Sequence, residues 1–117
     1  MAKGEIDAEI LSQILLLNED TPGFAASLLD TWNQEISRDM TRLEEAVAGG
    51  QLELAAKLAH GCRGIAATVG ALDCSEAFLK LEQVLDFGRL DELRPTLDVC
   101  ADRTEAATQR LRELLLS

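Results

Sequence analysis

The fold is decided by residues 58–71, which read LAHGCRGIAATVGA. Apolar residues recur there every three or four positions, which is typical of a helix with one buried face. The segment ends in Gly70 and Ala71, where we expect a turn into a second helix. His60, the only histidine of the chain, lies on this helix beside its apolar stripe. The segment therefore predicts one arm of a helical hairpin that carries an accessible imidazole.

The composition of the whole chain favours an all-α fold. The chain has 117 residues, of which 47% are hydrophobic but only 3% aromatic, so its core must consist mainly of aliphatic side chains. Helix-forming residues dominate, and only two prolines interrupt them. This length suits one domain, which we expect to span residues 1–117 with a helical core at about 21–115.

Apolar periodicity and capping signals predict five helices, at about residues 7–17, 21–48, 51–69, 73–87 and 91–115. The run Asn18-Glu19-Asp20 is expected to break the first helix. Thr21 is the expected N-cap of the second helix, with Pro22 at its first position. Asp73 is the expected N-cap of the fourth helix, with Glu76 completing a capping box. Because the connections are short, we expect an antiparallel up-down-up-down four-helix bundle with an additional short N-terminal helix.

The charge of the chain excludes some partners. The net charge is -10, so nucleic acid and anionic membranes are unfavourable partners. The charge is uneven, because residues 1–50 carry ten acidic and three basic groups, a balance of -7. Residues 51–70 carry one acidic and two basic groups, a balance of +1. His60 thus lies in a stretch that is not acidic, although so short a stretch can differ by chance.

Other features of the sequence indicate a cytoplasmic protein. The first residues lack the apolar core of a signal peptide, and the apolar run at residues 10–17 is too short to span a bilayer. The three cysteines do not include a C-x-x-C motif. Together with the one histidine they do not have the spacing of a zinc-binding site. An odd number of cysteines suits a reducing compartment.

Small residues surround His60 on the predicted helix. Its neighbours one turn away include Gly64 and Ala56, with Gly61 alongside. A glycine inside a helix costs about 1 kcal/mol relative to alanine, so two of them require a reason. One reason is close packing of helices; the other is clearance for a partner that approaches the imidazole. The second is favoured because Gly61 and Gly64 lie off the apolar stripe.

Three charged residues are candidates to assist His60. Glu82 lies as many residues after Ala71 as His60 lies before it, so an antiparallel hairpin places both at the same height. A hydrogen bond from Nδ1–H to Glu82 would leave Nε2 as the nucleophile. Arg63 and Lys57, one turn on either side, could neutralise charge arriving on Nε2. The alternative for each of the three is a solvated side chain on a helix surface.

These residues resemble the histidine-containing phosphotransfer (HPt) domains of multistep phosphorelays over about residues 20–115. The family pattern begins with Ala-His, and lysine and glycine follow three and four residues after the histidine. A Gly-Ala pair comes later in the chain, and a pair similar to Leu-Glu lies in the next helix. The corresponding residues here are Ala59-His60, Arg63-Gly64, Gly70-Ala71 and Leu81-Glu82, with Phe24, Leu43 and Ala46 upstream. Two positions depart from the pattern: Arg63 replaces the usual lysine, and Gly61 replaces a larger or hydroxyl residue.

The resemblance implies that His60 is phosphorylated on Nε2 and exchanges the phosphoryl group with receiver-domain aspartates of response regulators. The implied partners are these receivers and a hybrid sensor histidine kinase. The chain itself shows no P-loop or glycine-rich nucleotide loop and no carboxylate cluster, so we expect no cofactor of its own and Mg²⁺ from the receiver. We therefore expect a phosphocarrier rather than an enzyme, with Arg63, Gly64, Glu82, Lys57 and Gly61 supporting His60.

Two other functions remain open from the sequence. The same fold could dock receivers or kinases without carrying phosphate, which leaves His60 an ordinary surface histidine. The chain could also be a structural bundle that dimerises through the heptad seam of its last helix, although we expect a monomer.

Overall fold

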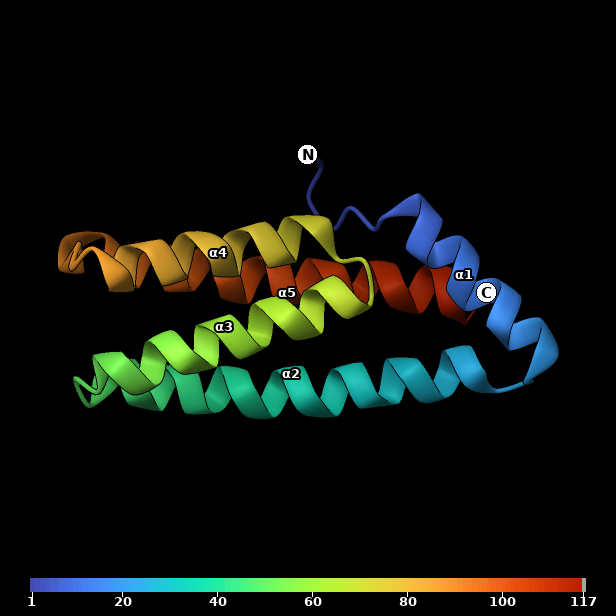
Figure 1. The fold of residues 1–117 in the computed structure, drawn as a ribbon, viewed down its shortest axis with the longest axis horizontal. Helices are drawn as coiled ribbons and strands as arrows, with labels where there is room; N and C mark the ends of the chain where they lie inside the picture. Colours follow the sequence, from blue (N-terminus) through green and yellow to red (C-terminus); the bar gives the residue numbers. More distant parts are fainter. Residues whose placement is uncertain (117) are drawn as a thin grey trace.

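The computed structural model describes residues 1–116, and within them all of the long elements are helices. The chain forms α1 (Ala8–Asp20), α2 (Phe24–Ala48), α3 (Leu52–Thr68), α4 (Leu72–Asp86), the short 3₁₀ helix η1 (Leu90–Glu92) and α5 (Leu93–Leu115). Helices α2 to α5 run antiparallel to their neighbours in sequence and form an elongated bundle, while α1 lies across one end (Figure 1). The predicted up-down-up-down bundle with a short N-terminal helix is confirmed.

The start of α2 differs from the prediction. The run Asn18-Glu19-Asp20 does not break α1 but forms its last turn. Thr21 is not the N-cap of α2, because Gly23 takes that position with φ of +92°, a left-handed conformation that glycine adopts readily. The side chain that caps α2 comes from α1 instead: the backbone N–H of Ala25 donates to Oδ1 of Asn18 at 3.0 Å. Local sequence does not reveal a cap supplied by another helix.

The predicted capping box at Asp73 is also wrong, since α4 begins at Leu72. Residues 1–7, here called the N-terminal arm, lie along the α3–α4 turn, where Ile6 and Ala71 form an isolated antiparallel β-bridge. The backbone N–H of Leu72 donates to the carbonyl of Glu5 at 3.1 Å, so the arm satisfies an amide of the first turn of α4. Asp73 accepts from the backbone N–H of Gly4 and pairs with Arg103. A contact between segments so distant in the chain leaves no local signal.

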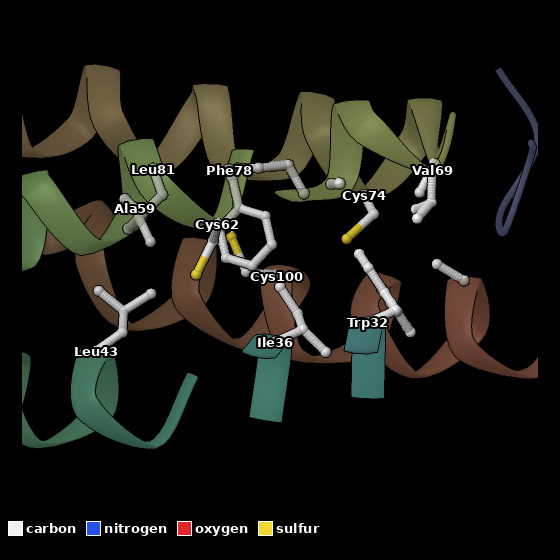
Figure 2. Close-up of a cluster of buried hydrophobic side chains, with 14 of the residues drawn as sticks. Trp32, Ile36, Leu43, Ala59, Cys62, Val69, Cys74, Phe78, Leu81 and Cys100 are labelled. Carbon is white, nitrogen blue, oxygen red and sulfur yellow. Dashed lines mark hydrogen bonds between the residues drawn. The ribbon is translucent and has the colours of Figure 1, made fainter. Parts of the chain in front are cut away.

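The core lies along the bundle axis where the inner faces of α2 to α5 meet (Figure 2). Large side chains come from α2, α4 and α5, among them Trp32, Phe78 and Leu111. Helix α3 contributes mostly small ones, namely Ala55, Ala59, Cys62 and Ala66, all fully buried. Small residues let α3 approach its neighbours closely, which fixes its orientation and therefore the direction of its outer face.

Candidate functional site

His60 stands on the outer face of α3, near the middle of the helix. Its side chain is 69% exposed. A Cβ atom added to Gly61 or to Gly64 would meet nothing within 4 Å, so neither glycine is needed for close packing. The structure thus favours clearance over helix packing as the reason for the two glycines. The imidazole is open to a molecule that approaches the flat outer surface of α3.

The predicted contact between the imidazole and Glu82 of α4 is present. Nδ1 of His60 lies 2.6 Å from Oε1 of Glu82. An ionised carboxylate can only accept hydrogen bonds, so at this distance Nδ1 must carry the proton and donate it. The Glu82 side chain is only 12% exposed, which restricts its motion. The pair fixes the ring and, in the neutral imidazole, leaves the lone pair on Nε2.

Arg63 lies against the same two residues. Its Nε is 2.7 Å from Oε2 of Glu82, an ion pair in which the N–H is not directed along the line between the atoms. Its Nη2 is 3.1 Å from Nδ1 of His60. Nδ1 cannot donate to Glu82 and accept from Arg63 at once, and the much shorter contact to the carboxylate decides the tautomer. Arg63 is therefore held chiefly by Glu82.

Lys57 is not brought to the imidazole. It is exposed one turn before His60, and no hydrogen bond or ion pair joins it to any residue within 1–116. On the other side of α3, Gly64 borders a groove of about 400 Å³ between α2 and α3. The apolar side chains of Leu28, Trp32 and Ile65 contribute to its lining. Sequence reasoning missed this groove, although the absence of a side chain at Gly64 is the feature that leaves it open.

No metal site or membrane span is found in the part of the chain that the structure describes. In residues 1–116, no three side chains from the usual metal-binding types lie close enough together to hold an ion. None of the described helices has the length and apolar character needed to cross a bilayer.

Comparison with protein families identifies the arrangement. The model of the Hpt domain matches residues 27–115, which is most of the chain. The chain belongs to the Hpt domain family. This family has a histidine phosphotransfer role in phosphorelays, in which its members interact with response-regulator receivers and kinases and act as carriers rather than as ordinary enzymes. His60, as the only histidine, is the sole candidate phosphoacceptor in this Hpt domain.

A solved structure shares the fold of this Hpt domain. A rice histidine-containing phosphotransfer protein superposes with a TM-score of 0.83 at 18% sequence identity, over 95% of this chain and 79% of the rice chain. At this identity the likeness establishes the helical bundle alone. No curated protein sequence matched the chain.

Proposed function

We propose that this Hpt domain is a phosphorelay intermediate that accepts a phosphoryl group on Nε2 of His60 and exchanges it with receiver-domain aspartates. The observation that carries the proposal is the hydrogen bond between Nδ1 and Glu82, because in the neutral imidazole it leaves the lone pair on Nε2, on an open surface. A ring with the opposite tautomer would present a proton instead of a lone pair.

In the proposed transfer between the receiver aspartate and His60, each bond that forms is matched by one that breaks. As the Nε2–P bond forms, the P–O bond to the receiver aspartate breaks, and its electron pair leaves with the aspartate carboxylate. The imidazole gains positive charge while Nδ1 keeps its proton, and Glu82 at 2.6 Å stabilises that charge. The reverse reaction delivers the phosphoryl group to a second receiver. Any Mg²⁺ that the reaction needs would be supplied by the receiver and would neutralise the charge of the phosphoryl oxygens.

The surface around His60 suits a protein partner. Gly61 and Gly64 give clearance over α3, and the groove that Gly64 borders offers an apolar lining between α2 and α3, beginning one helical turn from His60. Lys57, exposed and without an ion-pair partner in residues 1–116, is the cation that we expect to face the phosphoryl oxygens. We expect the domain to act as a monomer in the cytoplasm, with a hybrid sensor histidine kinase upstream.

The test mixes a phosphorylated cognate receiver with wild-type protein and with His60→Gln. We expect label to pass to the wild type as acid-labile, base-stable phosphohistidine and not to the variant. A matched control combines His60→Gln with Gln109→His, which places an exposed imidazole on α5, outside the surface around His60. This control should also stay unlabelled. Labelling of His60→Gln equal to wild type would refute the proposal, and receiver binding without label on the wild type would favour the non-phosphorylated docking module.

A further inference from the structure

The position three residues after the histidine is the chief departure of this chain from its family's pattern. The sequence suggested that Arg63 neutralises the incoming phosphoryl group, but its contacts lie on the other side of the imidazole. They go to Oε2 of Glu82 and to Nδ1, and none goes to Nε2. The Nε end of the guanidinium is thus paired with the residue that orients the histidine.

The two oxygens of Glu82 are divided between two partners. Oε1 lies 2.6 Å from Nδ1 of His60, and Oε2 lies 2.7 Å from Nε of Arg63. A carboxylate held at only one oxygen can rotate about its last bond, whereas contacts at both oxygens fix its plane. The Glu82 carboxylate is also largely withdrawn from water, so its charge requires a partner. Arg63 supplies that charge and shields the carboxylate from the α3 side.

We infer that Arg63 is a positioning residue, which acts through Glu82 to hold the proton on Nδ1 and the lone pair on Nε2. This inference rests on the proposed function, since the tautomer matters only if Nε2 is the nucleophile. The guanidinium is suited to this role because its Nε, close to the stem of the side chain, lies 2.7 Å from Oε2 of Glu82 and its planar shape is rigid. A lysine ammonium is a compact charge at the end of a flexible stem, so we expect it to restrain the carboxylate less well.

The inference separates the roles of the two cations beside His60. Arg63 is occupied by Glu82, whereas Lys57 has no ion-pair partner among the described residues. Removing Arg63 should therefore change the imidazole itself, even in the absence of a receiver. Removing Lys57 should leave the imidazole tautomer as it is.

The experiment measures the two imidazole ¹⁵N chemical shifts of His60 above pH 8 in wild type, Arg63→Gln, Arg63→Lys and Lys57→Gln. Because the chain has one histidine, the signals need no assignment. We expect the Nδ1–H tautomer to dominate in wild type and Lys57→Gln, to fall to a mixture in Arg63→Gln, and to recover only in part in Arg63→Lys. The rate of phosphoryl transfer to Arg63→Gln should fall about tenfold, in line with a misplaced reacting group.

Two results would overturn the inference. An unchanged tautomer in Arg63→Gln would show that Arg63 does not position the ring, and full recovery by lysine would show that charge alone suffices. A lower transfer rate with an unchanged tautomer would assign Arg63 to the phosphoryl group. If the wild type accepts no phosphoryl group from any receiver, the proposed function fails, but the tautomer measurement still decides the role of Arg63. Circular dichroism spectra and thermal unfolding establish that each variant is folded.

Discussion

Small residues occur on both faces of α3, for opposite reasons. On the inner face, Ala59, Cys62 and Ala66 are fully buried, and their size lets α3 pack closely against the bundle. On the outer face, Gly61 and Gly64 have empty space where a Cβ would stand. The comparison teaches that residue size alone does not distinguish packing from access. A larger side chain on the inner face would destabilise the bundle, whereas one on the outer face would obstruct the approach of a partner.

The largest expected difference between the faces is in thiol reactivity. Cys62 is fully buried, and burial raises the pKa of its thiol to about 12, while that of Cys74 rises to about 11 for the same reason. Only a thiolate reacts readily, so alkylation of the natural cysteines requires unfolding. In Ala67→Cys, a thiol on the outer face should react with iodoacetamide at pH 8 about a thousandfold or more faster, as measured by mass spectrometry. Comparable rates would show that the inner face opens easily.

The same thiols should make stability depend on pH. Their pKa values are higher in the folded than in the unfolded chain, where a thiol has its usual value of 9.0. Their contribution to stability is therefore complete below pH 9 and is lost as the pH rises towards 11 to 12. Urea titrations at pH 8 and pH 10 should show a lower free energy of unfolding at the higher pH. Cys62→Ala should reduce this pH dependence, and an equal dependence in both proteins would contradict the explanation.

The next largest effect is expected from a larger side chain on the buried inner face of α3. Ala59 is fully buried beside the site, so Ala59→Leu should force its neighbours apart and lower the free energy of unfolding by about 3 kcal/mol. Urea unfolding followed by circular dichroism measures this loss. The adjacent outer-face variant Gly61→Leu is the control and should show no comparable loss, because nothing lies within 4 Å of its added Cβ. Similar losses in both would remove the distinction between the faces.

On the outer face a larger side chain should slow transfer without lowering stability. Gly64→Leu places a branched side chain one turn from the imidazole, and we expect phosphoryl transfer from a receiver to fall about a hundredfold, or about 2.7 kcal/mol in the barrier. Stability should rise slightly, since leucine favours a helix more than glycine does. Rapid-quench assays and thermal unfolding measure the two quantities. Wild-type transfer rates in Gly64→Leu would mean that the partner does not approach over this glycine.

The smallest effect is expected for Gly61→Ala. Alanine favours a helix over glycine by about 1 kcal/mol, so the free energy of unfolding should rise by up to that amount. Transfer should fall less than in Gly64→Ala, because position 61 is turned about 100° round the helix from His60, whereas position 64 lies one turn along and only about 40° away. A greater fall in Gly61→Ala than in Gly64→Ala would relocate the approach of the partner towards the other side of α3.

Much of this fold could be predicted from the sequence because it is encoded locally. The apolar stripes of α2 and α3 repeat at helical spacing, and Gly49 and Gly70 mark the ends of these helices. The contact between His60 and Glu82 followed from counting residues on either side of the turn, since an antiparallel hairpin relates sequence distance to height.

The parts that could not be predicted depend on contacts between distant segments. Thr21 and Asp73 looked like N-caps, but Gly23 at positive φ and the N-terminal arm determine where α2 and α4 begin. At the site, the sequence left open whether Arg63 neutralises charge on Nε2 or is a solvated side chain, and it did not predict the contact with Glu82, because the side-chain direction depends on how far α4 rotates towards α3. The ion pair at 2.7 Å follows from that rotation and from no local pattern.

The N-terminal arm also bears on the order in which the molecule assembles. Its backbone joins the turn between α3 and α4 through Ile6 and Ala71, and Lys3 reaches Asp102 on α5, a residue 99 positions further along the chain. The surface that holds the arm is therefore complete only when residues as far apart as 71 and 102 have been synthesised and packed together. We expect the arm to dock last, after the hairpin that carries His60 has closed, so that it secures a site whose shape is already set.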